Sequence, residues 1–227
     1  RRGQPSHPDR PEPLPLPPGP GQKALVQRQV RDNSCAALQA LGFYQPVLTP
    51  QWRDADDERC FALTLTVDPG EPTRISALDI TLNGDAADDP AFQRTIDNAG
   101  LEQGQRLRHD RYSRLKQSLQ QLLINRGYAE GSVTRHRLEV DRDRREARVV
   151  LHVDSGPRYR FGEITLTGDD QINERLRRAY LQFDSGEPFS NDKLLATQQA
   201  YLGAGYFSAV RLDRGEPDAD SRTIDVS

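Results

Sequence analysis

Three helical stretches of this chain end in the same way, with a glycine followed by an aromatic residue and then by a strand-like run. The glycines are Gly42, Gly127 and Gly205, and both intervals between them are about eighty residues long. A period of this length is too long for a solenoid repeat and fits one small α/β module. The chain is therefore predicted to be a tandem array of a single folding unit.

The glycine has a physical reason to stand at each helix end, because it adopts the left-handed conformation without a Cβ penalty. In the Schellman arrangement the residue after it packs on the residue five positions earlier. These pairs are apolar or aromatic in all three copies: Phe43 with Leu38, Tyr128 with Leu123, and Tyr206 with Tyr201. Other landmarks recur in step, namely Leu82–Asp85 as Leu166–Asp169 and Gly104 as Gly186.

Composition limits the classes of protein that the chain can belong to. A mean hydropathy of −0.79 without a long apolar run excludes a transmembrane helix, and 35% hydrophobic content fits several small cores. A net charge of −3 argues against a primary nucleic-acid binder, and the basic clusters at 135–148 and 175–178 are interpreted as solvated surface. The abrupt start and end suggest a piece of a larger precursor.

The repeat predicts four segments along the chain. Residues 1–22 hold eight of the sixteen prolines and are expected to be extended or disordered. Residues 23–69 form a partial first module, 70–155 a complete second module, and 156–227 a third module truncated in its last strand.

Hydrophobic periodicity predicts the elements of each module. The first should contain a helix over 23–41 and strands over 47–52 and 61–67. In the second, a strand over 78–82 precedes a helix opened by Asp89 and Pro90 and a longer helix capped by Asp110. A hairpin over 133–140 and 149–153 follows. In the third we expect a strand over 161–167, helices over 172–183 and 191–204, and a strand over 207–212.

This order of strand, helix, helix, strand, strand, with glycine–aromatic helix ends and a glycine-containing turn before each first strand, resembles POTRA domains. These are the periplasmic modules of Omp85-family outer-membrane proteins. Ser155–Gly168 looks like the entry to the last such domain, and Leu41–Pro46 makes the chain most similar to the TamA subfamily, the outer-membrane component of the translocation and assembly module. The resemblance covers nearly everything from Lys23 onward.

The resemblance implies a fold class and a location. Each module would be α+β, a βααββ unit with a three-stranded mixed sheet covered on one face by two helices, and its strand order would be first-third-second. The array would lie on the periplasmic side of the outer membrane. It would join a C-terminal membrane barrel, outside this sequence, to an inner-membrane-anchored TamB-like partner, and would serve unfolded outer-membrane clients such as autotransporters.

Two alternatives within this class are the POTRA region of a BamA-type assembly protein and that of a two-partner secretion transporter. A remote alternative from another class is a KH-like nucleic-acid-binding array, because KH domains share the strand-helix-helix-strand order. A KH module needs a basic GxxG loop between its helices. The segment Gly100–Gly104 has the wrong spacing and contains Glu102, so no nucleic-acid partner is expected.

The sequence shows no catalytic set. The four histidines, His7, His109, His136 and His152, are scattered, and none has metal-ligand spacing with cysteine or carboxylate residues. Neither GxSxG nor a P-loop is present. Acidic pairs such as Asp88–Asp89 precede helices, where capping and the helix dipole explain them. We expect no enzyme activity, no cofactor and no metal.

Edge strands are the predicted functional surface, since an extended segment of another chain can pair with their free N–H and C=O groups. With the first-third-second order, the edges are Pro46–Trp52, Val133–Val140 and Phe207–Leu212. Arginines on these strands, including Arg137, are interpreted as charges that discourage edge-to-edge aggregation. The candidate binding residues are Val47, Thr49, Val133, Arg135, Phe207, Val210 and Arg211.

The two cysteines, Cys35 and Cys60, both lie in the first module. A disulfide between them would close a loop of about 25 residues and contribute about 3–4 kcal/mol in the chain-entropy model. The alternative is two unpaired thiols that fill core positions as small apolar residues. An exporting compartment favours the bridge.

Overall fold

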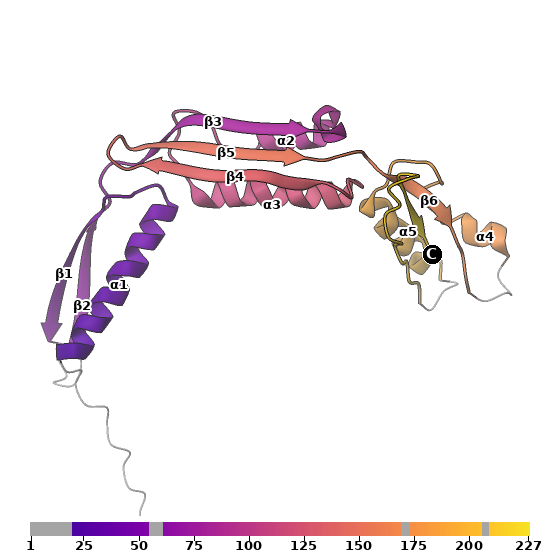
Figure 1. Cartoon of the computed structure of the whole chain (residues 1–227). Helices are drawn as coiled ribbons and strands as arrows, with labels where there is room; N and C mark the ends of the chain where they lie inside the picture. Colours follow the sequence, from indigo (N-terminus) through magenta and orange to yellow (C-terminus); the bar gives the residue numbers. More distant parts are fainter. Residues whose placement is uncertain (1–19, 55–60, 169–172, 206–208) are drawn as a thin grey trace, which may run out of the picture. The chain divides into compact units, whose positions relative to one another are not determined.

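The computed structural model describes residues 20–54, 61–168, 173–205 and 209–227 (Figure 1). The chain divides into two compact units between Pro72 and Thr73. The first unit contains one helix and a pair of strands, and the second contains two successive sheets with their helices.

In the first unit, helix α1 (Pro20–Ala40) precedes strands β1 (Val47–Asp54) and β2 (Phe61–Asp68), which pair antiparallel. The helix begins three residues before its expected start at Lys23. Strand β1 alternates as a half-buried strand should, with Val47 and Thr49 exposed and Trp52 half-buried. The indole N–H of Trp52 donates to the side-chain oxygen of Gln27 at 3.0 Å, which ties β1 to α1.

The glycine helix ends have the backbone geometry that the repeat predicts. Gly42 and Gly127 adopt φ values of 91° and 79°. The amide of Phe43 donates to the carbonyl of Leu38 at 2.9 Å, and that of Tyr128 donates to Leu123 at 2.9 Å. These are the long hydrogen bonds of the Schellman motif, so the prediction is confirmed for both copies. Gly205 also has a positive φ of 73°, but Tyr206 lies outside the described residues.

The second module is a three-stranded sheet with two α-helices on one side (Figure 1). Its strand order is β3-β5-β4, with β3 parallel and β4 antiparallel to the central β5. This confirms the expected mixed sheet and the first-third-second order. In chain order its elements are β3 (Arg74–Asn83), the 3₁₀ turn η1 (Asp85–Asp88), α2 (Pro90–Asp97), α3 (His109–Asn125), β4 (Ser132–Asp141) and β5 (Glu146–Asp154).

Side-chain periodicity explains the core of this module. Helix α3 buries residues at intervals of three or four, which is one face of an α-helix. Strand β5 buries alternate residues on one face of the sheet, from Ala147 to Val153, and also buries Val150 on the other face. The two faces meet through Leu115, Leu119 and Leu123 on α3 and Ala147, Val149, Leu151 and Val153 on β5, all at most 3% exposed.

The third module repeats the plan with shorter elements: β6 (Arg160–Ile164), α4 (Glu174–Arg178), α5 (Asn191–Gly203) and β7 (Thr223–Val226). Strands β6 and β7 are parallel, as β3 and β5 are. Its core is aromatic: the rings of Phe161 and Phe183 stack with centroids 3.9 Å apart, and Phe189 lies 4.9 Å from Phe161.

The second and third modules contact each other at the glycine that ends α3. The amide of Tyr159 donates to the carbonyl of Gly127 at 2.8 Å. A Cβ atom added to Gly127 would lie 2.7 Å from the Cβ of Phe189. The glycine therefore terminates one helix and also leaves room for a core aromatic residue of the next module.

Replacing Gly127 by alanine should separate these two roles. We expect Gly127→Ala to lower the free energy of unfolding by about 1–2 kcal/mol from the left-handed backbone, and by a further 1–3 kcal/mol or so from overpacking against Phe189. Gly104→Ala is the matched control, because Gly104 has a φ of 87° but nothing within 4 Å of its Cβ position. Urea unfolding measures both variants, and equal losses would contradict the packing role of Gly127.

Candidate functional site

Strand β4 forms one edge of the second module's sheet, since β5 is its only neighbour there. Along an edge strand, alternate residues point their N–H and C=O groups away from the ladder. The register shifts between Val133 and Arg135, so Thr134 is bulged and regular pairing runs from Arg135 to Asp141. Two of the predicted binding residues, Val133 and Arg135, therefore lie on either side of the bulge.

The two faces of β4 differ in chemistry. His136, Leu138 and Val140 stand opposite Leu151, Val149 and Ala147 of β5, on the face that the helices cover. Arg135, Arg137 and Glu139 stand opposite His152, Val150 and Arg148, on the other face. On β4, Leu138 and Val140 are half-buried, whereas Arg135, Arg137 and Glu139 are exposed. A strand added beside β4 would continue an apolar face and a charged face.

The opposite edge of this sheet is partly covered. The segment after Gly104 pairs with the start of β3: the amide of Leu107 donates to Thr73 at 2.9 Å, and that of Ile75 donates to Gln105 at 2.9 Å. The third module has the same edge pairing, since the amide of Phe189 donates to the carbonyl of Tyr159 and the amide of Phe161 donates to the carbonyl of Glu187. This explains the recurrence of Gly104 as Gly186, because both glycine amides donate at 2.7 Å to the first strand of their module.

In the first unit, Val47 and Thr49 lie on β1, which pairs with β2 alone among the described residues. Val47 is 61% exposed. The strand contains Pro50, which has no backbone N–H to offer to an added strand. Strand β4 has no proline over its length. Its edge is thus the more complete template for backbone pairing.

The expected strand Phe207–Leu212 of the third module is wrong in its position. Phe207 lies outside the described residues, and Val210 and Arg211 belong to no strand. The pairing occurs later: Asp213 and Ser227 exchange two backbone hydrogen bonds, at 2.8 and 3.0 Å. The alternating apolar residues Val210 and Leu212 instead line a cavity of about 120 Å³ with Tyr201.

The predicted disulfide remains a prediction. Cys35 is a half-buried residue of α1, and Cys60 lies outside the described residues.

A buried carboxylate joins the second module to the start of the third, which sequence analysis did not reveal. Asp89, with its side chain 5% exposed, accepts hydrogen bonds from Arg126 at 2.6 Å and from the Tyr128 hydroxyl at 3.1 Å. It also caps α2 through the amide of Ala91. Arg158, from the segment before β6, lies 3.8 Å away and donates to the carbonyl of Arg126. Only the capping role was readable from the sequence.

These contacts set the protonation of the cluster. Burial alone would raise the pKa of Asp89, but hydrogen bonds from the Ala91 amide and the Arg126 guanidinium outweigh it and hold the pKa below its usual value. Burial and the neighbouring carboxylate raise the pKa of Tyr128 to about 12. At neutral pH the cluster therefore contains a charged carboxylate beside a neutral phenol. We interpret it as a cluster that stabilises the fold.

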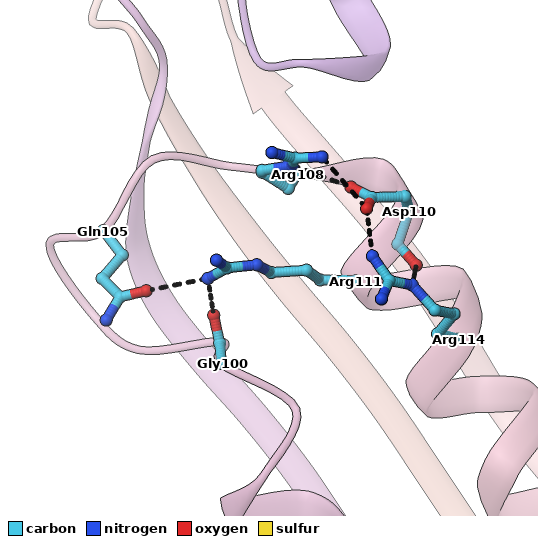
Figure 2. Close-up of polar contacts among 6 residues, drawn as sticks. All are labelled: Gly100, Gln105, Arg108, Asp110, Arg111 and Arg114. Carbon is cyan, nitrogen blue, oxygen red and sulfur yellow. Dashed lines mark hydrogen bonds and ion pairs between the residues drawn. The ribbon is translucent and has the colours of Figure 1, made fainter.

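A second polar cluster closes the connection between α2 and α3 (Figure 2). The side chain of Arg111 donates to the carbonyl of Gly100 at 2.6 Å, and Arg108 and Arg114 both bind Asp110. Hydrogen bonds from Arg108 and then Arg114 lower the pKa of Asp110 to about 2. The expectation that Asp110 caps α3 is wrong, because the helix begins at His109 with Arg108 at the cap position. Asp110 lies in the first turn, where the helix dipole favours its charge.

Of the histidines that the structure describes, His109 and His152 are half-buried and His136 is exposed. His152 Nε2 lies 3.1 Å from a carboxylate oxygen of Asp79, whose pKa is lowered chiefly by this hydrogen bond. Burial lowers the pKa of His109. Over the ranges with described coordinates, no group of three or more histidine, cysteine or acidic residues could hold a metal ion, and no helix is long and apolar enough to cross a membrane.

The geometry thus defines a class of protein: tandem βααββ modules whose most accessible unpaired backbone lies along a sheet edge. Two protein-family models match this chain. The family model described as POTRA domain TamA domain 1 matches residues 13–69. The POTRA model described as surface antigen variable number repeat matches residues 77–156 and 159–227.

The chain is also similar to several solved structures. POTRA3-5 of BamA from Haemophilus influenzae is 16% identical, with 90% of this chain and 78% of that chain covered and a TM-score of 0.49. BamA from Haemophilus ducreyi lacking POTRA domains 1-3 is 18% identical, with 67% and 28% covered and a TM-score of 0.50. CdiB from Escherichia coli is 15% identical, with 94% and 36% covered and a TM-score of 0.35.

The chain belongs to the POTRA family. POTRA domains are non-catalytic periplasmic parts of Omp85-family outer-membrane proteins, and they interact with partner and client proteins. The predicted family and periplasmic location are thereby confirmed.

Neutralising Asp89 should destabilise the second unit in a pH-dependent way. We expect Asp89→Asn to lower the free energy of unfolding by about 2–4 kcal/mol at pH 7, since Arg126 loses its buried partner. Because the folded-state pKa of Asp89 is depressed, this stability exists above the unfolded value of 3.8 and is lost as pH falls through the folded value. Urea unfolding measured from pH 7 to pH 2.5 should show the free energies of unfolding of the wild type and of Asp89→Asn converging.

The control is Asp97→Asn, which changes an exposed carboxylate of α2. It should change stability by less than about 0.5 kcal/mol. A difference between wild type and Asp89→Asn that stays constant down to pH 2.5 would rule out the charged-pair explanation.

Proposed function

We propose that this chain is the periplasmic POTRA region of a TamA-like factor for outer-membrane protein assembly and translocation. The match of residues 13–69 to a model described as TamA domain 1 supports this subfamily. The proposed partners are an inner-membrane-anchored TamB-like protein and unfolded outer-membrane clients such as autotransporters. The BamA-type alternative is supported by likeness of fold. The two-partner secretion alternative stays a prediction.

The contact that we propose is β-augmentation, in which an extended client segment pairs with an edge strand. The observation that carries this proposal is β4 itself: ten residues long, free of proline, and without a neighbour on its outer side in the described residues. Backbone pairing depends little on side-chain identity, so one edge can receive many unfolded clients. The proposed sites on β1 and around Val210 and Arg211 are secondary.

Site-specific photocrosslinking tests where clients bind. A photoreactive amino acid at His136, exposed on β4, should label a urea-denatured autotransporter barrel domain diluted into the protein. The same group at Gln117, exposed on α3, should label it weakly. Labelling confined to α3 would contradict docking at the edge.

A pair of proline variants tests backbone pairing directly. Adjacent residues of a strand point their N–H groups in opposite directions, so Leu138→Pro and Glu139→Pro remove one inward and one outward donor. The variant that unfolds at nearly the wild-type urea concentration has lost the outward N–H, and it should bind the client at least about threefold more weakly. Unchanged client binding by that folded variant would argue against β-augmentation at β4.

A further inference from the structure

The solvent-facing row of β4 begins with two arginines, Arg135 and Arg137, and continues with Glu139 and Asp141. Arg135 forms no ion pair with any residue that the structure describes. Arg137 lies 4.0 Å from Glu139, and the two side chains are 62% and 51% exposed. A pair this long and exposed is weak. Two guanidinium groups are therefore available along the edge.

The other strands of the sheet do not supply carboxylates to these two arginines. On β5, His152 and Val150 stand opposite them. Asp79 lies on β3, on the far side of β5, and β5 side chains already bind it. His152 lies 3.1 Å and Arg148 3.7 Å from its carboxylate oxygens. Because β5 separates β3 from β4, Asp79 does not stand beside the arginines of β4.

We infer that the β4 edge selects extended segments with acidic residues at alternate positions and apolar residues between them. This inference rests on the proposed docking at β4. Side chains of an added strand alternate between the two faces, with directly opposite Cβ atoms about 5 Å from those of β4. One face of the segment then lies beside Arg135 and Arg137. The other lies beside His136, Leu138 and Val140.

The bulge at Thr134 limits how long the selected segment is. Regular register along β4 extends from Arg135 to Asp141, so a segment of seven residues matches it. Within that length, the outward positions stand opposite Arg135, Arg137, Glu139 and Asp141. Acidic residues are favoured at the two positions opposite the arginines.

The same arginines also fit the protective role that the sequence suggested. A second β4 edge aligned in parallel would bring guanidinium groups near guanidinium groups, and like charges across a strand pair are destabilising. A strand with carboxylates opposite Arg135 and Arg137 would be attracted instead. The two arginines therefore disfavour parallel pairing of β4 with a copy of itself and favour an acidic client segment.

Two matched peptides test the inference on the full 227-residue chain. Both are fluorescein-labelled seven-residue peptides with valine opposite His136, Leu138 and Val140, either glutamate or lysine opposite Arg135 and Arg137, and serine opposite Glu139 and Asp141. Fluorescence anisotropy at low salt should give a dissociation constant about fivefold lower for the glutamate peptide, from two cross-strand pairs. The ratio should shrink in 0.5 M salt or so, because exposed charges are screened.

Charge reversal on the strand provides the second arm. Arg135→Glu combined with Arg137→Glu should reverse the preference in favour of the lysine peptide. Arg31→Glu combined with Arg175→Glu is the matched control, since it changes the net charge equally at exposed positions on α1 and α4. The control should keep the wild-type preference.

The outcomes separate the inference from the function on which it rests. Equal affinity for the two peptides, with amide NMR shifts in β4 for both, would overturn charge selection and leave docking at the edge intact. Shifts outside β4 for both peptides, or no binding of either, would overturn docking at this edge as well. A control variant that loses the preference would show a net-charge effect and overturn the assignment to Arg135 and Arg137.

Discussion

The parallel pairing of β3 with β5 decides what the second module can present to another protein. A hairpin alone would leave both β4 and β5 with an open side. Because the chain crosses over through α2 and α3 and places β3 beside β5, the last strand becomes central. The apolar residues of β5 are then buried, and β4 is left with one side that has no strand beside it. The exposed backbone is thus a product of topology and does not depend on a special loop.

The two edges of that sheet are nevertheless unequal. The segment Gly104–Leu107 pairs with the start of β3, and the corresponding segment covers β6 in the third module. Each cover depends on a glycine with a positive φ, 87° at Gly104 and 86° at Gly186. Such a turn is inexpensive for glycine alone. This pairing leaves fewer unpaired N–H and C=O groups along β3, so β4 is the longer free edge.

Much of this could be predicted from the sequence, because the strongest signals are local. Helix ends with glycine, alternation along strands and the Asp89–Pro90 helix start all reflect interactions within a few residues. The failures are non-local. The alternation of Val210 and Leu212 is genuine, but those residues line a cavity because strand pairing begins at Asp213. The cluster of Asp89, Arg126 and Arg158 joins residues far apart in sequence, and no spacing rule anticipates it.

The contact at Gly127 has a consequence for how such an array can grow or shrink. The carbonyl of this glycine accepts a hydrogen bond from Tyr159, and the space above its Cα holds Phe189. The end of α3 and Phe189 therefore pack together across the border between the second and third modules. A third module with a smaller residue at the position of Phe189 would leave this space unfilled.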